Sequence, residues 1–242
     1  EFAERKIPNL KKHKLQVSNC DVLEQISFVE NLKERYKKIL VVCNTVKKAQ
    51  EVYKKITKPK MLLHSRFTRF DRNERESFLN DFVGILVSTQ VVEVSLDIDF
   101  DFLITELAPY DVLVQRMGRV LRRYKTDGNY LPDEPNVYIF SDNVSGKGTV
   151  YEGYLLEKTL DFLKEGEISE EEKTKICEEF YSKENLRGTS YLRDFQNAIN
   201  NIKNIVLTKK NQAQDIFRNI DSINILPLSL LNRTIRNDNI AS

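Results

Sequence analysis

The feature that most constrains the fold is an alternation of short apolar runs with longer amphipathic segments. Nearly continuous apolar runs lie at residues 39–43, 61–63, 85–88, 102–106 and 137–140. Such runs are typical of strands that are buried on both faces. The segments 22–37, 46–56 and 71–82, the last opened by Asp71 as a cap, place apolar residues at helical spacing. This alternation predicts an α/β fold with a mainly parallel sheet flanked by helices.

The pattern changes after residue 140. Residues 141–149 are rich in turn formers, and helical spacing then recurs in 151–164, 169–182 and 192–205. Ser169 and Glu172 form a capping-box pattern at the start of the second of these helices. We therefore predict a basic segment at 1–20, the sheet domain at 21–140, a linker at 141–150 and a helical extension at 151–242.

Composition narrows the class of protein. A hydrophobic fraction of 40% and a net charge of +2 are ordinary for a soluble domain, so a nucleic-acid site requires local clustering of basic residues. The three cysteines show no C-x-x-C spacing, which argues against a zinc site and for a reducing compartment. Without a signal peptide or a long apolar stretch, we expect a cytoplasmic protein. Because the chain lacks an initial methionine, we expect a piece of a longer protein.

A basic segment runs from Gln115 to Arg122. It contains Arg116, Arg119 and Arg122 at intervals of three, with Gly118 among them and no carboxylate. In a helix these arginines would share an arc of about 120°. Guanidinium forks match phosphate oxygens, so a polyphosphate ligand would offset their mutual repulsion. From this segment alone, a solvated basic helix face is an equally good interpretation.

A polar loop upstream favours the ligand interpretation. It joins the apolar runs at 85–88 and 102–106, and it contains Thr89, Gln90, Glu93, Ser95 and Asp97. In parallel sheets, loops at the carboxyl ends of strands carry the ligand chemistry. Loop and basic segment are therefore expected at one edge of the sheet.

Loop and basic segment together resemble motifs V and VI of superfamily-two helicases, which lie in the second of two RecA-like motor domains. The pattern T-Q-V-x-E-x-S-L-D at 89–97, then Ala108-Pro109, then Q-R-x-G-R-x-x-R at 115–122, is most similar to the CRISPR-associated Cas-three helicases of type I systems. The resemblance is strong over residues 39–140. The weaker resemblance at 216–227 implies the start of a truncated C-terminal domain.

The resemblance implies roles at the nucleotide. Asp97 would face the ribose, Arg119 and Arg122 would reach the γ-phosphate across an interdomain cleft, and Gln115 would lie near the phosphate or the attacking water. Arg116 would contact the nucleotide or would instead pair with an acid such as Glu93.

The resemblance also implies a nucleic-acid surface. The residues expected to contact the phosphodiester backbone of single-stranded DNA are His64, Ser65, Arg66, Thr89 and Gln90. Hydroxyls, backbone amides and an arginine suit binding that is independent of base sequence.

Half of an ATPase site is missing from the sequence. No G-x-x-x-x-G-K-[ST] occurs, residues 145–149 fail to match it, and no D-E-x-[HD] box is found. We therefore expect ATP and Mg²⁺ to be held mainly by a separate first RecA-like domain, and this chain alone to be inactive. The implied partners are that domain, single-stranded DNA, a CRISPR effector complex and a metal nuclease, which two histidines do not supply here.

Two alternatives remain open at this stage. One is the motor domain of another superfamily-two helicase, such as an RNA helicase, because backbone contacts read sugar identity weakly. The other is a non-enzymatic nucleic-acid-binding module with decayed motor residues, which would be expected to lack the arginines.

Overall fold

The computed structural model describes residues 11–79, 81–93, 97–122 and 133–204. The chain divides into two compact units, residues 1–185 and residues 186–242. In its described part, the second unit contributes helix α7 (Ser190–Asn204). The expected C-terminal domain at 216–227 lies outside the described residues, as do Val94–Leu96 of the polar loop.

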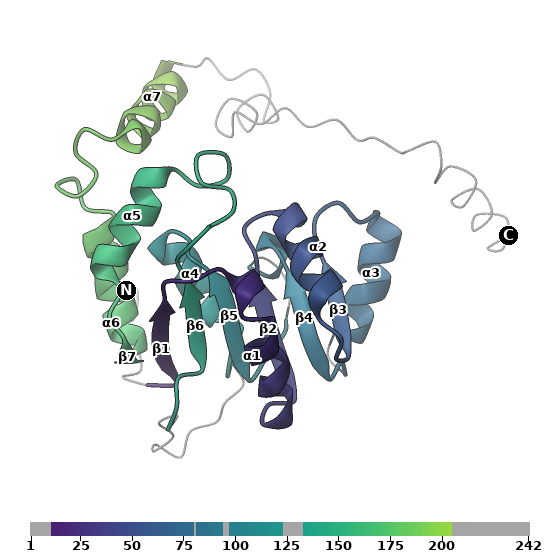
Figure 1. Cartoon of the computed structure of the whole chain (residues 1–242). Helices are drawn as coiled ribbons and strands as arrows, with labels where there is room; N and C mark the ends of the chain where they lie inside the picture. The colour runs from purple at the N-terminus through teal and green to yellow at the C-terminus, as the bar shows by residue number, and fades with distance from the viewer. Residues whose placement is uncertain (1–10, 80, 94–96, 123–132, 205–242) are drawn as a thin grey trace, which may run out of the picture. The chain divides into compact units, whose positions relative to one another are not determined.

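A seven-stranded sheet forms the centre of the first unit, in the order β3-β4-β2-β5-β6-β1-β7 (Figure 1). All neighbouring strands are parallel except β1 and β7, which pair antiparallel. The predicted mainly parallel α/β sheet is confirmed. The strands are β1 (His13–Ser18), β2 (Lys38–Val42), β3 (Lys60–Leu63), β4 (Gly84–Ser88), β5 (Phe102–Glu106), β6 (Val137–Phe140) and β7 (Gly166–Ile168).

The apolar runs are explained by burial on both faces of the sheet. In β2, Leu40 and Val42 pack into the core on one face, whereas Ile39 and Val41 pack into the core on the other. All four side chains are fully buried. Because alternate residues of a strand point to opposite faces, a strand covered on both sides must be apolar throughout.

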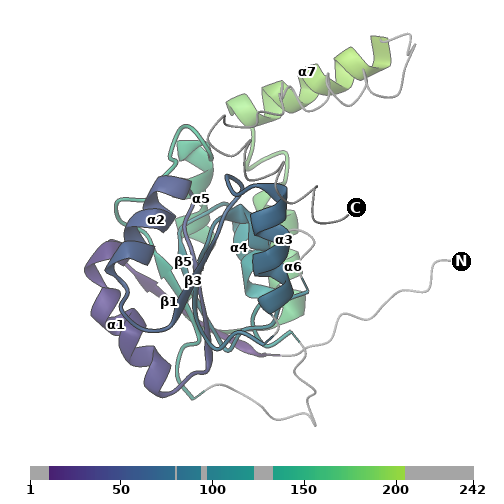
Figure 2. The ribbon, with the colours of Figure 1, turned by 90° about the vertical axis from the view of Figure 1, so that its right-hand side faces the viewer.

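Helices cover both faces of the sheet (Figure 2). On one face lie α1 (Ile26–Asn31) and α2 (Val46–Lys55), and on the other lie α3 (Arg69–Phe78), α4 (Tyr110–Met117) and α6 (Glu170–Phe180). Helix α5 (Gly153–Phe162) contacts α6. Single 3-10 turns complete the described elements at η1 (Val22–Glu24), η2 (Leu32–Glu34) and η3 (Gln90–Val92).

Two strands lie outside the range 21–140 over which the sequence predicts the sheet. Strand β1 comes from the segment described as basic, and its buried positions are Leu15 and a polar residue, His13. Strand β7 has three residues, too few to show a period of two, and interrupts the segment predicted as a helical extension.

Local helix signals were partly right. The capping box of Ser169 and Glu172 is confirmed at the start of α6. The segment 22–37 is split into η1, α1 and η2 rather than forming one helix. Helix α3 is capped by Thr68, whose hydroxyl accepts from Asp71 N, so the expectation that Asp71 caps it was wrong.

The doubly covered sheet predicts a large cost for a cavity at its centre. We expect Leu40→Ala to lower the free energy of unfolding by about 2–5 kcal/mol, because the void in β2 cannot collapse. Val83 is 52% exposed, so Val83→Ala should change it by less than about 0.5 kcal/mol. Urea unfolding followed by circular dichroism measures both, and equal effects would contradict the assigned core.

Candidate functional site

Some of the predicted site residues lie at the carboxyl ends of neighbouring parallel strands. His64 follows β3, Thr89 follows β4, and these two strands pair in register. Ser88 Oγ donates to Leu63 O over 2.8 Å, which ties the two strand ends together. Asn44 and Glu106 lie at the corresponding ends of β2 and β5. This edge of the sheet is the one where α/β proteins carry their ligands.

Arg116 is the centre of a buried hydrogen-bond network at this edge. It projects from α4, and its relative exposure is 0%. Its five N–H groups have five acceptors from four parts of the chain. These are Glu93 Oε1 at 2.8 Å, Thr105 Oγ1 at 2.7 Å, Glu106 O at 3.2 Å, Asn44 Oδ1 at 3.0 Å and Tyr151 Oη at 3.2 Å.

This geometry corrects one expected role and supports the other. A guanidinium that is fully buried and donates to five internal acceptors has no N–H left for a nucleotide phosphate. Arg116 is therefore not placed to bind the cofactor. It pairs with Glu93 instead, as the alternative interpretation had it. Burial raises the pKa of the Glu93 carboxyl, and the nearby Arg116 charge opposes that effect.

The basic segment is not one continuous helical face. Helix α4 ends at Met117 with Gly118 as its C-cap, so Arg119 and Arg122 lie beyond the helix. Gly118 has an ordinary helical φ of −63°, and an added Cβ would meet Gln115 O of its own helix at 3.2 Å.

After the helix, the chain forms a short bridge to the loop that precedes β5. Val120 pairs with Phe100, and Phe100 N and Leu121 N make backbone bonds of 2.9 Å across this bridge. Arg122 N donates to Asp99 Oδ1 at 2.8 Å. We call residues 97–100 and 119–122 the latch. It places both arginines next to Asp97, which helical spacing alone did not predict.

The arginines of the latch differ from Arg116 in exposure. The Arg122 side chain is 43% exposed, and its Nη1 lies 3.4 Å from Asp97 Oδ1. Arg119 is half-buried and donates from Nη2 to Glu93 O at 2.5 Å. Burial and then the charge of Arg122 lower the pKa of Arg119. Gln115 is exposed on α4. These groups are accessible to an anionic ligand in a way that Arg116 is not.

Glu106 is a site residue that the sequence analysis missed. Its buried carboxylate accepts from Asn44 N at 2.7 Å, Ser145 N at 2.8 Å and Ser145 Oγ at 2.7 Å. It thereby holds the 141–149 turn against the end of β2. The sequence does show an acidic residue at the end of an apolar run. Because a buried charge requires polar partners, this residue could have indicated a site.

The residues expected to contact nucleic acid differ in solvent exposure. Ser65 and Arg66 are exposed, whereas His64 and Thr89 are 4% and 2% exposed. Thr89 thus lacks the open position that a side-chain contact to phosphate requires. Gln90 is half-buried, and its Nε2 donates to Asn44 O at 2.7 Å.

His64 belongs to an aromatic stack. Its ring lies 4.3 Å from that of Phe67, and the Arg75 guanidinium lies 4.4 Å from the centre of the Phe67 ring. Burial lowers the pKa of His64, and its Nδ1 accepts from Arg66 N at 3.3 Å. The ring therefore supports the loop that presents Arg66 to solvent.

Among the residues that the structure describes, no group of three or more His, Cys, Asp or Glu side chains could hold a metal ion. Within that part of the chain, no helix has the length and apolar character needed to span a bilayer.

Comparison with known proteins gives matches over most of the chain. The family model of the C-terminal part of the CRISPR-associated nuclease/helicase Cas3 matches residues 35–125, which include the polar loop and Arg116–Arg122. The CRISPR-associated nuclease/helicase Cas3 of Methanothermobacter thermautotrophicus is 29% identical over 229 residues. That match covers 89% of this chain and 27% of the relative.

Solved structures share the fold. The crystal structure of T. fusca Cas3 with AMPPNP matches with a TM-score of 0.66 at 21% identity, over 91% of this chain and 30% of that one. A chain of a CRISPR RNA-guided surveillance complex in a pre-nicking state matches with a TM-score of 0.58 at 21% identity, over 87% and 28%. The chain thus spans less than a third of each of these three proteins.

The buried network predicts that Arg116 is a stability residue. We expect Arg116→Met to lower the free energy of unfolding by about 3–5 kcal/mol, because it leaves the buried Glu93 without a counter-charge. Arg122→Ala, in an exposed pair, should cost about 0–1 kcal/mol. Chemical denaturation of the purified chain measures both values. An Arg116→Met variant as stable as the parent would contradict the network.

Proposed function

We propose that this chain is the second motor domain of an ATP-dependent helicase. The family match and the shared fold support its resemblance to the CRISPR-associated Cas3 helicases. The motor would translocate along single-stranded DNA in CRISPR antiviral defence. ATP would bind between this domain and a first RecA-like domain, and closure and opening of that cleft would move the strand.

The single observation that carries the proposal is the latch. It holds Arg119 and Arg122 beside Asp97, next to the amino end of β5, while Arg116 is withdrawn into the interior. An arginine brought to a transferring phosphoryl group stabilises the charge that develops there. A domain that supplies arginines and no phosphate loop supplies half of an ATPase site.

The accessible groups take separate roles in this proposal. Arg119 and Arg122 would contact the γ-phosphate of ATP held by the first domain, and Gln115 would lie near that phosphate or the attacking water. Asp97 would accept from the ribose hydroxyls, for which a carboxylate is well suited. Its contact with Arg122 would then be exchanged for contacts to the nucleotide when the cleft closes.

Mg²⁺ belongs with the phosphates of ATP in this scheme. The chain offers no fitting ligand set among its described residues, so the ion would be held by the first domain together with the nucleotide. When bound there, it would neutralise charge on the β- and γ-phosphates. The residues of this chain would add the positive charge on the opposite side.

The strand would be held at the ends of β3 and β4. The exposed Ser65 and Arg66, with Gln90 at the next strand end, are available to a phosphodiester backbone. His64 would act by supporting the Arg66 loop through its stack with Phe67. Such contacts are independent of base sequence, as a translocase requires.

A CRISPR effector complex and a metal nuclease would be partners of the whole protein. The similarity to a chain of a CRISPR RNA-guided surveillance complex supports the first of these, and the nuclease/helicase description of the Methanothermobacter relative supports the second. Both would act through parts of the protein beyond the described residues or through separate chains.

The latch predicts the effect of removing an arginine. In the full-length protein, we expect Arg119→Ala to lower kcat for DNA-stimulated ATP hydrolysis by about 10³- to 10⁵-fold. Arg119→Lys should restore little, because an ammonium lacks the planar fork. Steady-state phosphate release measures the rates, with Lys175→Ala on the outer surface of α6 as the matched control.

The isolated chain serves as the negative control for this experiment and should hydrolyse ATP negligibly. DNA-stimulated turnover by the isolated chain that Arg119→Ala abolishes would contradict the half-site. Unchanged turnover in the full-length Arg119→Ala variant would refute the assignment of the arginine.

The exposed loop after β3 predicts a second effect. We expect Arg66→Ala to weaken binding of the full-length protein to single-stranded DNA and to lower the salt slope of log Kd by about 0.7, since one phosphate contact is lost. Fluorescence anisotropy at several salt concentrations measures this, with the exposed Lys164→Ala as control. An unchanged slope would remove Arg66 from the interface. Tighter binding to RNA of the same sequence would favour an RNA helicase instead.

A further inference from the structure

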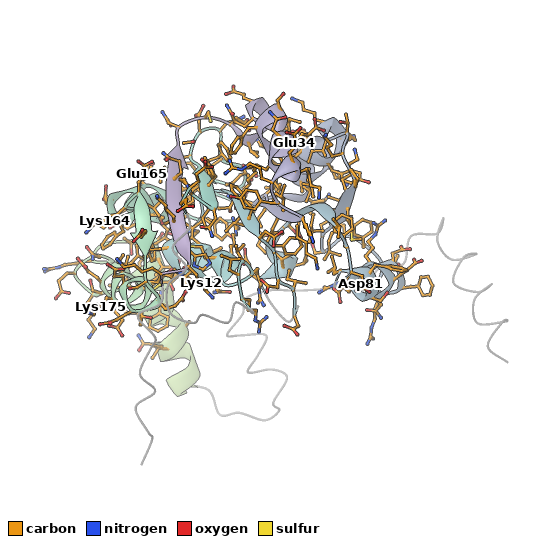
Figure 3. The ribbon with its side chains drawn as sticks, turned by 90° about the horizontal axis from the view of Figure 1, so that it is seen from below. Lys12, Glu34, Asp81, Lys164, Glu165 and Lys175 are labelled. Atoms are coloured by element: carbon orange, nitrogen blue, oxygen red, sulfur yellow. The ribbon has the colours of Figure 1, made fainter. Side chains whose placement is uncertain are left out.

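A second polar cluster, buried at His13 and Lys173, contacts the latch at Val120 O. It consists of His13 from β1 with Lys173 and Glu170 from α6, all outside the segment 35–125 that matches the family model. His13 is 0% exposed and Lys173 is 2% exposed. Lys12, labelled in Figure 3, lies next to the cluster with its Nζ 4.0 Å from Glu170 Oε1.

The contacts of His13 fix which nitrogen carries the proton. One ring nitrogen, Nε2, lies 3.1 Å from Val120 O, and the other, Nδ1, lies 2.5 Å from Lys173 Nζ. A carbonyl oxygen only accepts and an ammonium only donates. Nε2–H therefore donates to Val120 O, while Nδ1 accepts from Lys173. Lys173 Nζ also donates to Glu170 Oε1 at 2.7 Å. Hydrogen bonds thus connect Glu170, through Lys173 and His13, to Val120 O of the latch.

The acceptor of this chain is a backbone group within the latch. Val120 lies between Arg119 and Leu121, and its side chain is fully buried. Leu121 adopts φ of 50°, a left-handed conformation that costs a non-glycine residue free energy unless its surroundings impose it. A hydrogen bond to Val120 O fixes the peptide plane immediately before this residue. It thereby fixes the direction in which Arg119 and Arg122 leave the backbone.

Stability alone does not explain the cluster. Replacing a buried ionic group by apolar residues of similar volume is often neutral or stabilising. Apolar side chains are buried nearby in the same sheet, among them Leu15 of β1 and Ile168 of β7. A cluster that is costly to bury, and that donates a hydrogen bond from His13 to the latch, is accounted for by the orientation that it imposes.

We propose that the buried His13–Lys173 pair positions Arg119 and Arg122 of the latch for phosphoryl transfer. The inference rests on the function proposed above for Arg119. His13 touches neither nucleotide nor nucleic acid and acts through the Val120 carbonyl. Burial, then the charges of Lys173 and Lys12, hold the pKa of His13 well below its usual value, in accord with the neutral ring that this geometry requires.

The test is a double-mutant cycle in the full-length protein. His13→Leu removes the donor to Val120 O, and we expect it to lower kcat for ATP hydrolysis about tenfold while single-stranded DNA affinity stays within about twofold. His13→Gln offers an amide donor at a similar reach and should recover most of the loss. In an Arg119→Ala background, His13→Leu should cause no further loss, because His13 acts through that arginine.

Two further variants keep the result interpretable. Ile168 pairs with His13 between β1 and β7. Ile168→Ala should lower stability without removing the hydrogen bond from His13 to Val120 O. Its kcat should match the parent at temperatures well below its Tm. Lys173→Met removes the donor to Nδ1, leaves His13 in place, and should lower kcat about threefold. It replaces His13→Leu in the cycle if the latter fails to fold.

The outcomes separate this inference from the proposed function. Unchanged kcat in Arg119→Ala would overturn the function and the inference together. Loss in Arg119→Ala with unchanged kcat in His13→Leu and Lys173→Met would overturn the positioning role alone. The positioning role would also fall if Ile168→Ala lowered kcat as much as His13→Leu, or if the two losses were additive in the cycle.

Discussion

The burial of one arginine charge governs the architecture of the site. A guanidinium removed from water is tolerated only when its donors are satisfied and its charge is opposed. Arg116 meets both conditions because Asn44, Glu93 and Thr105 come from separate strand ends and loops that must all be in place. Folding of the sheet therefore brings the acceptors of Arg116 together. If these strand ends were displaced, the buried guanidinium charge would lose its partners.

Sequence patterns predicted the sheet well because its central strands obey a simple rule. Residues 39–43 and 85–87 are apolar at every position since both faces of the sheet are covered. The same rule fails at the edge, where β1 buries a histidine and β7 has three residues. Their place depends on partners more than 100 residues away, such as Asn136 Oδ1, which accepts from Lys14 N. Periodicity over a short window contains no information about such partners.

The site residues show the same division. The motif pattern indicated the loop at 89–97 and the basic segment at 115–122, and it raised the pairing of Arg116 with Glu93 as an alternative, which the structure shows. The sequence did not show that α4 ends at Met117, because no proline follows. In the structure, the C-cap Gly118 has an ordinary helical φ. The end of the helix is set by the pairing of Val120 with Phe100, a tertiary contact. Three arginines at equal spacing consequently have different surroundings: Arg116 is buried, Arg119 is half-buried and Arg122 is exposed.

The latch explains why so much polar structure is buried near it. Leu121 at φ of 50° is a conformation that costs about 1–3 kcal/mol and persists only where neighbouring contacts over-determine it. Contacts from both sides supply that excess, since Glu93 O accepts from Arg119 on one side and His13 donates to Val120 O on the other. Under the proposed function, Arg119 would meet a phosphate carried by another domain, so the error in its position would be the sum of the errors in both domains. Fixing the backbone through contacts to Arg119 and to Val120 O would keep the share of this domain small.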